Sequence, residues 1–466
     1  MISIPKRVTG LLSGSGLLAA TLLTVGGSGA AAATAAAAQP VPLAQLLSTH
    51  AFLTPPTTAQ CEAAIGLACY SPEQFQTAYN LGPLYKKGFT GKGETIVIVD
   101  SYGFQGIGQE LKAFDKGFHL PAPPNFTILQ PEGPIPPFNA TKRPMMVGWA
   151  EETSLDVEYS HAIAPDANIL LVETPVAETL GVTGFPQIVA AENYVIDHHL
   201  GDVITQSFAA PEPTFPNAAS ILRLRSAYKN AAANGITVLA AAGDTGPSGA
   251  KTLSSEGFAE SYFLHRVAEW PADDPLVTGV GGLELFLDAK GNPTQPPAVW
   301  NDTALFGSPA AGSGGLSTVF SRPSYQNGVK AVVGSSRGFP DISMSAAVNG
   351  AALVFLNANA AQGAAGFYLI GGTSEASPEF SGIIAIADQM AGHGLGLINP
   401  ALYAMEAAGD PGIVDVTNGT NTVTFPQNGA THTVRGWSAV SGYDLSTGVG
   451  TVNAALFIPE LVKAVG

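Results

Sequence analysis

The stretch that decides the fold is Ile236-Thr237-Val238-Leu239-Ala240-Ala241-Ala242-Gly243-Asp244, an apolar run of strand length that ends in a glycine and an acid. Similar apolar runs recur at Thr95–Val99, Ile169–Val172, Val203–Ile204 and Leu276–Val280. Stretches with helical spacing lie between them, including Gln187–His198 and Ala219–Ala233. Near-continuous apolar strands that alternate with helices are typical of a buried parallel sheet with helices on both faces. We therefore expect an α/β fold with its chemistry at the carboxyl ends of the strands.

The composition limits the class of protein. The chain has 466 residues, 46% of them hydrophobic, which is enough for a sizeable core. Only 12% are charged, and 36 acidic against 20 basic residues give a formal net charge of -16, which argues against a nucleic-acid partner. A surface poor in Lys and Arg and rich in carboxylates suits work in acid. With no internal repeat, we expect one domain, with residues 295–313, rich in Pro, Gly, Ala and Ser, as a long surface insertion.

The N-terminus has the pattern of a secretory signal peptide. Lys6 and Arg7 precede an apolar run from Leu11 to Val25, and the Ala-rich segment Ala30–Ala38 offers cleavage sites. We predict that residues 1–38 are the signal and that the chain is exported. The run is short and interrupted, and no later segment is a clean membrane span, so we expect no membrane association.

Two cysteines, Cys61 and Cys69, lie in the short segment 39–70 that follows the predicted signal. In an oxidising compartment two cysteines this close most simply form a disulfide, and the alternative is a pair of buried thiols. The main body of the chain is then residues 71–466, which opens with Ser71 as a helix cap and Pro72 at the first helical position.

The segment Gly371-Gly372-Thr373-Ser374-Glu375-Ala376-Ser377-Pro378 is the most specific chemical signal. It follows an apolar strand, Phe367–Ile370, and precedes a helix that we expect from about Pro378 to Met390. A glycine turn exposes a hydroxyl, and a helix start supplies unpaired N–H groups beside it, so Ser374 is a candidate nucleophile. The alternative is an ordinary helix-capping Ser or Thr.

A serine nucleophile needs a base, and none of the eight histidines, at positions 50, 119, 161, 198, 199, 265, 393 and 432, lies in a Gly-rich motif such as His-Gly-Thr. Carboxylates are the alternative. Glu152 and Asp156 lie four residues apart at the start of a predicted amphipathic helix that runs toward His161. Such a pair is usually solvated, but two carboxylates held close share protons and can relay them.

A third acid, Asp244, follows the most apolar strand. Burial at a strand end would raise its pKa, and a protonated Asp244 could donate a hydrogen bond to a developing oxyanion. The alternative is a turn aspartate, because Gly-Asp-Thr-Gly is good turn chemistry. Asp100, which ends the run Ile96–Val99, has the same two interpretations.

From about Ser71 to its C-terminus, the chain resembles the sedolisin family of serine-carboxyl peptidases. The resemblance rests on the Glu152-x-x-x-Asp156 spacing, on Gly243-Asp244 after a strand, and on Gly372-Thr373-Ser374 with Pro378. It implies a subtilisin-like fold. It also implies a role for each residue: Ser374 is the nucleophile, Glu152 the base, Asp156 the carboxylate that orients it, and Asp244 the oxyanion donor. Asp100 would extend the chain of carboxylates beyond Asp156.

Two C-terminal loops carry acids and glycines, and turn-forming Asp is their ordinary interpretation. The resemblance implies one structural Ca²⁺, held by the side chains of Asp415 and Asp444 and by the carbonyl oxygens of Val416, Val440 and Gly442. Hard cations bind such oxygen sets. Val440 stands where relatives commonly have Gly, a change that a carbonyl ligand tolerates.

Two departures from the family pattern concern the N-terminus and Phe208. Only about 30 to 50 residues separate the predicted signal from Ser71, where relatives carry a long pro-segment. Phe208 lies where relatives often have Trp, so the apolar wall is kept and the indole N–H is lost.

We therefore predict a secreted, acid-active serine-carboxyl endopeptidase that acts on peptides or proteins as a monomer. A silent binding protein on the same fold and an esterase that uses the same serine are the alternatives.

Overall fold

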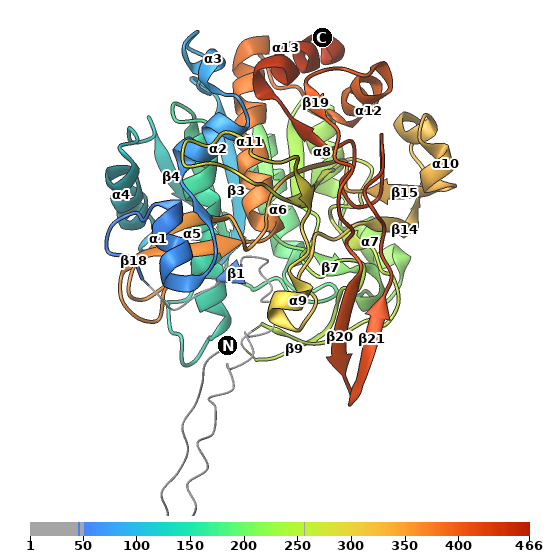
Figure 1. Cartoon of the computed structure of the whole chain (residues 1–466), viewed down its shortest axis with the longest axis horizontal. Coiled ribbons are helices and arrows are strands. Elements are labelled where there is room, and N and C mark those ends of the chain that lie inside the picture. The colour runs from blue at the N-terminus through green and yellow to red at the C-terminus, as the bar shows by residue number, and fades with distance from the viewer. Residues whose placement is uncertain (1–44, 47–50, 256) are drawn as a thin grey trace, which may run out of the picture. The chain divides into compact units, whose positions relative to one another are not determined.

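The computed structural model describes residues 45–46, 51–255 and 257–466, all of which belong to one structural unit (Figure 1). The predicted signal peptide, residues 1–38, lies outside the described residues. Across the described ranges, no helix has both the length and the apolar character needed to cross a bilayer.

The largest sheet confirms the predicted α/β fold. Its strands run in the order β13-β12-β8-β6-β3-β5-β4, with β16 also paired to β12, and every pairing except that of β13 is parallel. Val97 of β3 lies opposite Leu170 on one neighbour and Ile204 on the other. The strands are β3 (Thr95–Ser101), β4 (Phe126–Leu129), β5 (Asn168–Thr174), β6 (Val203–Gln206), β8 (Thr237–Ala241), β12 (Thr278–Glu284), β13 (Ala298–Val299) and β16 (Ile342–Ser345).

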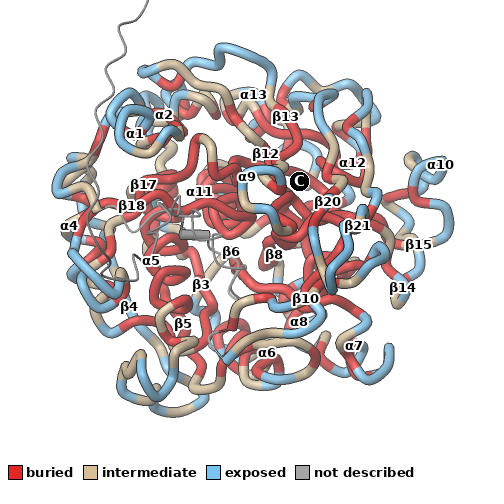
Figure 2. The backbone as a smooth tube through the Cα atoms, turned by 60° about the horizontal axis from the view of Figure 1, so that its bottom comes forward, coloured by how far each residue is buried: buried red, intermediate tan, exposed pale blue. Residues whose placement is uncertain are grey.

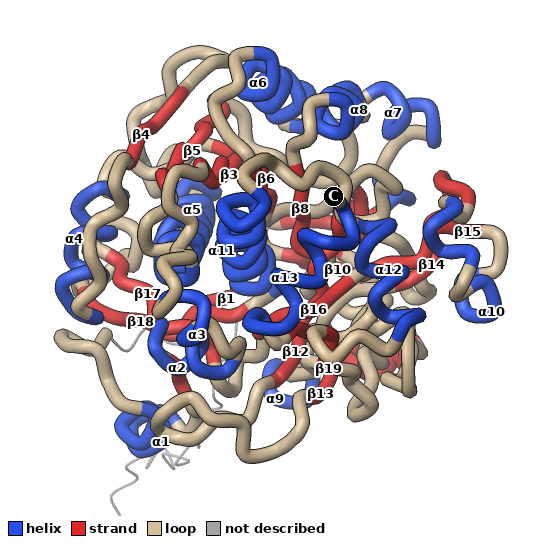
Figure 3. The backbone as a smooth tube through the Cα atoms, turned by 90° about the horizontal axis from the view of Figure 1, so that it is seen from above, coloured by secondary structure: helices blue, strands red, loops and turns tan. Residues whose placement is uncertain are grey.

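Alternate side chains of β3 enter two different cores, because successive residues of a strand point to opposite faces. Ile96 and Ile98 pack in the core that includes α5 (Met145–Ile163) and α11 (Thr373–Ala391). Val97 and Val99 pack in the core that includes α6 (Phe185–Asp197) and α8 (Ser226–Ala233). Helices therefore cover both faces of the sheet, as Figure 3 shows.

Helices α5 and α11 pack side by side at very close range (Figure 3). A Cβ added at Gly382 of α11 would lie 2.6 Å from the Cβ of Ile163 on α5, so only glycine fits there. The hydroxyl oxygens of Ser160 and Ser381 lie 3.2 Å apart across the same contact. Small residues on both helices thus set the distance between them.

A second sheet has the order β1-β18-β17-β2 and carries the N-terminal segment. Its strands are β1 (Gln45–Leu46), β2 (Cys69–Tyr70), β17 (Ala351–Leu356) and β18 (Gly366–Gly371). The disulfide between Cys61 and Cys69, with an S–S distance of 2.04 Å, confirms the predicted pairing and links α1 (Thr58–Ile65) to β2.

The remaining elements surround these two sheets. Ser71 caps α2 as predicted, with Gln74 completing a capping box. The helices are α2 (Pro72–Ala78), α3 (Gly82–Tyr85), α4 (Ile107–Phe118), α7 (Ala218–Arg223), α9 (Thr303–Phe306), α10 (Lys330–Val333), α12 (Asn399–Ala408) and α13 (Ala454–Val465), with short 3₁₀ turns at Glu212–Thr214 and Ser324–Asn327. The other strands are β7 (Ala210–Pro211), β9 (Ala250–Leu253), β10 (Ala259–Tyr262), β11 (Glu269–Trp270), β14 (Gly315–Ser321), β15 (Ser336–Phe339), β19 (Ile413–Val414), β20 (Val423–Gln427), β21 (Ala430–Val434) and β22 (Thr451–Val452).

Three details of the sequence interpretation are wrong. The predicted helix 219–233 is two helices, α7 and α8. The predicted amphipathic helix at Glu152 is α5, which begins earlier and is buried along almost its whole length (Figure 2). Residues 295–313 are not a surface insertion throughout, because Ala310 and Ala311 are buried. Their small side chains let the backbone approach the end of β8.

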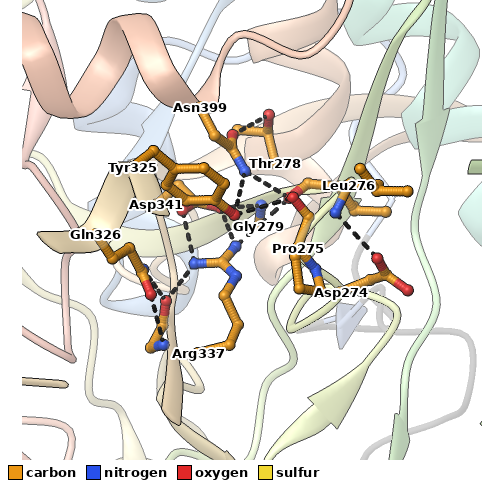
Figure 4. Close-up of polar contacts among 12 residues, drawn as sticks. Asp274, Pro275, Leu276, Thr278, Gly279, Tyr325, Gln326, Arg337, Asp341 and Asn399 are labelled. Atoms are coloured by element: carbon orange, nitrogen blue, oxygen red, sulfur yellow. Dashed lines mark hydrogen bonds and ion pairs between the residues drawn. The ribbon is translucent and has the colours of Figure 1, made fainter. Parts of the chain in front are cut away.

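A buried ion pair holds the start of β16 (Figure 4). Both carboxylate oxygens of Asp341 accept hydrogen bonds from the Arg337 guanidinium, at 2.8 and 2.5 Å, and both residues have 0% exposed side chains. The Tyr403 hydroxyl and the Gly279 N–H also donate to Asp341, each at 2.8 Å. Each carboxylate oxygen of Asp341 therefore accepts two hydrogen bonds, whereas the buried Arg337 Nε has no partner among the described residues. Such hydrogen bonding of the carboxylate favours a stable buried ion pair.

Replacing Asp341 with Asn should destabilise the fold strongly, because the Arg337 charge would remain buried without its partner. We expect the free energy of unfolding to fall by about 3–5 kcal/mol, measured by denaturant titration. Lys463→Gln, which breaks the exposed pair with Glu460, is the control and should leave the unfolding midpoint unchanged. A loss below about 1 kcal/mol for Asp341→Asn would contradict the structural role of this ion pair.

Candidate active site

Ser374 lies in the first turn of α11, which begins five residues before the predicted start at Pro378. Gly372 is the N-cap, with a φ of 111° that favours glycine, and its N–H donates to the Ala346 carbonyl at 2.7 Å. The Ser374 Oγ is buried and has no hydrogen-bond partner among the described residues. A capping role for Ser374 is therefore wrong, and its hydroxyl is available for chemistry.

Asp244 lies beside Thr373, the residue that precedes Ser374. The Thr373 N–H and Oγ1 both donate to Asp244 Oδ1, at 2.8 and 2.7 Å, and the Gly243 N–H donates to Thr373 Oγ1 at 3.0 Å. These bonds tie the end of β8 to the start of α11. Asp244 is 1% exposed and accepts two hydrogen bonds from Thr373, whereas an ordinary turn aspartate is exposed and bonds only within its own turn.

The segment after Ala310 fixes the Gly243-Asp244 backbone from the other side. The Ser313 N–H donates to the Gly243 carbonyl at 2.8 Å, and the Ala311 N–H donates to the Asp244 carbonyl at 2.9 Å. A Cβ on Gly243 would come within 2.9 Å of the Ser313 Oγ, so this position requires glycine. The sequence analysis did not predict that residues 310–313 hold the Gly243-Asp244 backbone. The small side chains of Ala310, Ala311 and Gly312 were the available indication, because they allow two backbones to pack closely.

Glu152 and Asp156 are both fully buried in α5, so the interpretation as a solvated helix face is wrong. Burial raises the pKa of Asp156 well above its usual range, and the nearby charges of Glu152 and Asp100 raise it further. The Ser207 Oγ donates to Asp156 Oδ1 at 2.8 Å. Ser207, which follows β6 directly, is a site residue that sequence reasoning missed.

Asp100 ends β3 and belongs to the same group of carboxyls. It is fully buried, and burial raises its pKa to about 7. Phe208 is also buried and lies with its ring centroid 6.3 Å from that of Trp149 on α5. Two buried aromatic rings therefore pack together, one on the residue after Ser207 and the other on the helix that carries Glu152 and Asp156.

Two further acids, Glu375 and Glu379, follow Ser374 on α11 and were not singled out from the sequence. Both are fully buried, and burial is the main cause that raises the pKa of each well above its usual range. The charge of Asp244 also raises the pKa of Glu375, and the Tyr79 hydroxyl donates to Glu379 Oε2 at 2.7 Å. Their positions, within and directly after the segment Gly371–Pro378, were the available indication that these acids belong to the site.

The two loops of the expected cation site meet in the structure. The Gly442 N–H donates to Asp415 Oδ2 at 3.1 Å. Asp444 is buried, its Oδ1 accepts from Ser446 and Thr447, and its Oδ2 accepts from the Val440 N–H at 3.0 Å.

The donor set at these loops has the chemistry of a Ca²⁺ site. Within the described ranges, no hydrogen bond is donated to the carbonyl oxygens of Val416, Val440 or Gly442. Two carboxylates and three such carbonyls from two neighbouring loops fit a hard cation. The described residues contain no cluster of three or more acidic, His or Cys side chains placed to bind a metal, so any cation here would depend on the carbonyls.

Comparison with known proteins finds that the chain is similar in sequence to named peptidases. Kumamolisin from Bacillus sp. (strain MN-32) is 31% identical over 307 residues, which cover 64% of this chain and 49% of kumamolisin. Sedolisin from Pseudomonas sp. (strain 101) is 30% identical over 277 residues, 59% of this chain and 43% of that protein. The chain thus matches about half the length of these curated relatives. No protein-family model matches it.

Among solved structures, the chain resembles Pseudomonas sedolisin, described as a serine-carboxyl proteinase complexed with two molecules of pseudo-iodotyrostatin, with a TM-score of 0.68 and 25% sequence identity. The match covers 85% of this chain and 99% of that one. The shared fold over a whole solved sedolisin and the sequence identity to several of its relatives make this chain similar to the sedolisin family in both fold and sequence.

Proposed function

We propose that the chain is a secreted serine-carboxyl endopeptidase that works in acid on peptide or protein substrates, as a monomer. The observation that carries this proposal is the hydrogen-bonded link from Asp244 through Thr373 to the turn that bears Ser374. The buried pair Glu152 and Asp156 on the adjoining helix α5 supplies the acid–base groups. The Cys61–Cys69 disulfide supports export to an oxidising compartment.

In the proposed mechanism, the Ser374 Oγ attacks the peptide carbonyl while Glu152 takes its proton. Asp244, in its protonated form, donates a hydrogen bond to the tetrahedral oxyanion. Because Asp244 Oδ1 accepts both bonds from Thr373, the proton belongs on Oδ2. Glu152 then protonates the leaving amine, and water releases the acyl group by the reverse sequence of proton transfers.

Asp156 positions Glu152 and shares its proton. Two buried carboxyls this close do not both ionise, so the pair carries one proton in the working state. The raised pKa of Asp156 favours holding that proton on Asp156 in acid, which leaves Glu152 able to accept one from the serine. Ser207 fixes Asp156 with its 2.8 Å hydrogen bond.

We also propose that Asp415, Val416, Val440, Gly442 and Asp444 hold one structural Ca²⁺. When bound, the ion would neutralise the two carboxylates and link the segment after β19 to the loop before β22. It takes no part in the reaction.

Ser374→Ala should abolish hydrolysis of a denatured protein at pH 3–4 and leave the thermal midpoint almost unchanged, because the Ser374 Oγ makes no hydrogen bond within the described residues. Ser335→Ala, at an exposed position before β15, is the control and should retain activity. Activity of Ser374→Ala within about tenfold of wild type, barely 1.4 kcal/mol of barrier, would exclude Ser374 as the nucleophile. Ester hydrolysis without peptide hydrolysis by the wild type would favour the esterase alternative.

The pH profile should peak in acid and fall as Asp244 loses its proton. Asp244→Asn keeps a donor that does not ionise, so its alkaline limb should move to higher pH even if the maximal rate falls. Glu152→Gln removes the base and should be inactive at every pH. Asp288→Asn, at an exposed turn, is the control with an unchanged profile. A wild-type optimum near pH 8 with an active Glu152→Gln would exclude this mechanism.

Unfolding must be monitored in the same pH series, because buried acids also make stability depend on pH. Burial raises the pKa of Asp100 and Glu110 to about 7, and of Glu151 and Glu192 to about 8. The folded chain therefore holds protons that the unfolded chain releases near pH 4. This contribution to stability is complete below about pH 4 and is lost as the pH rises through 7 to 8.

Removing Ca²⁺ with a chelator should lower the thermal midpoint, because the ion binds only the folded chain. At a hundredfold excess over its Kd, the ion would contribute about 2.7 kcal/mol. Asp415→Asn should abolish the calcium-dependent shift, whereas Mg²⁺ should not replace Ca²⁺. Since Asp444 also organises its own turn, Asp415 is the more informative position. A thermal midpoint that does not change when the chelator is added would contradict the proposed Ca²⁺ site.

A further inference from the structure

One edge of strand β17 is covered by side chains in place of a neighbouring strand. Beyond Ala352, β17 pairs only with β18 among the described strands. Alternate residues of an antiparallel strand direct their backbone groups to the same edge. Three such residues on the other edge of β17 bond to side chains: the Tyr159 hydroxyl donates to the Leu353 carbonyl at 3.1 Å, the Phe355 N–H to Glu158 Oε2 at 2.9 Å, and the Asn357 N–H to Glu110 Oε1 at 2.6 Å.

The three side chains come from α4 and α5, which both pack against β17 (Figures 2 and 3). Glu158 and Tyr159 belong to α5, and Glu110 belongs to α4. We call these three residues the β17 clamp. Successive residues of an α-helix lie about 100° apart around its axis, so Glu158 lies on the side of α5 opposite the proposed acid–base pair. The clamp therefore holds the back of the helix whose front carries that pair.

The hydrogen bonds of the clamp require protonated acids. The Ser154 Oγ lies 2.7 Å from Glu110 Oε2 and 2.8 Å from the Ala150 carbonyl oxygen. A hydroxyl has one hydrogen, so Ser154 donates to only one of these oxygens, and a protonated Glu110 supplies the second hydrogen. Glu158 Oε1 is buried and has no hydrogen-bond partner within the described ranges. An ionised Glu158 would thus bury a charged oxygen that no donor satisfies.

The groups around the clamp disfavour its ionisation further. Glu110 and Glu158 are both 0% exposed, and neither forms an ion pair with a basic residue in the part of the chain that the structure describes. Burial raises the pKa of Glu110 to about 7. Burial also raises the pKa of Glu158 well above its usual range, and the charges of Glu110 and Asp115 raise it further. The other titratable groups that face the clamp are Asp115 on α4, His161 on α5, and Glu375 and Glu379 on α11.

We propose that Glu110 and Glu158 are positioning residues that hold α5 against the edge of β17 only while both carry their protons. When the pH rises and they ionise, two like charges are buried side by side, and α5 separates from the strand. The acid–base pair on α5 then loses its position. The clamp itself does not depend on the proposed function, whereas its effect on catalysis rests on that function.

Hydrogen exchange of the full chain, followed by mass spectrometry between pH 5 and pH 7 and corrected for the intrinsic exchange rates, tests the clamp. In the open state the two acids regain their ordinary pKa near 4. Opening of α5 and of residues 351–357 should therefore increase about tenfold for each pH unit and for each acid. Glu110→Gln and Glu158→Gln keep a neutral acceptor for the strand, so each variant should remove one of these factors of ten per pH unit.

Two further variants separate the charge from the hydrogen bond and from burial in general. Glu110→Ala removes the acceptor of the Asn357 N–H and should lose protection already at pH 5. Glu192→Gln is the matched control, because Glu192 is also buried, with a pKa of about 8, but lies on α6 at the other face of the sheet. Its exchange should increase with pH as in the wild type. The same increase with pH in both clamp Gln variants, or no increase in the wild type, would overturn the inference.

Activity measured after a pH jump connects the clamp to catalysis. Each chain is kept at pH 8 and then assayed at pH 4 on a denatured protein. Glu110→Gln should match the wild type before the incubation and should lose activity with a half-time about tenfold longer. An equal half-time for the two chains would overturn the link between the clamp and the acid–base pair. Exchange that follows the expected pattern in a chain without peptidase activity would contradict the proposed function and leave the clamp standing.

Discussion

The close contact of α5 with α11 is the constraint on which the proposed site depends. The two helices come close together because Gly382 has no side chain and because the residues that meet at Ser160 and Ser381 are small. One helix carries Glu152 and Asp156, and the other begins with the turn that bears Ser374, the proposed nucleophile. Because both helices are buried against one face of the sheet, the acid–base pair and the serine keep their relative positions without a flexible loop.

Burial also decides the chemistry of this centre. In water, Glu152 and Asp156 would both be ionised at neutral pH, and neither would hold a proton. Removed from water and placed near Asp100, Asp156 keeps its proton to a much higher pH. The same burial acts on Glu375 and Glu379, one and five residues after the serine. The fold therefore sets acid–base behaviour with ordinary carboxyl groups, where a histidine would otherwise be needed.

The sequence was sufficient to predict the sheet, the disulfide and the glycine turn before Ser374, because each depends on local patterns. The runs at 95–99 and 236–240 are apolar at successive positions, which buried strands require, and Gly372 marks a turn that few residues could form.

Long-range packing explains what the sequence did not predict. The acid-rich stretch from Glu151 to Glu158 looks solvated, and only its enclosure by β3, β17, α4 and α11 makes it buried. The role of Ala311 and Ser313 likewise depends on backbone hydrogen bonds to Asp244 and Gly243, which lie 67 and 70 positions earlier in the chain. Pro378 suggested a helix start, because no local signal shows that α11 already begins at Thr373.

Because α5 is enclosed, substitutions at the surface of the chain and substitutions that alter the acid pair on α5 can occur independently of each other. A substitution on the surface does not touch the helix that carries Glu152 and Asp156, since both are 0% exposed and their neighbours are core residues. Loops at the rim of the sheet can therefore vary in length and shape while the spacing of the acid pair stays fixed by one helical turn. New peptide preferences can arise in such a scaffold without redesign of its proton chemistry.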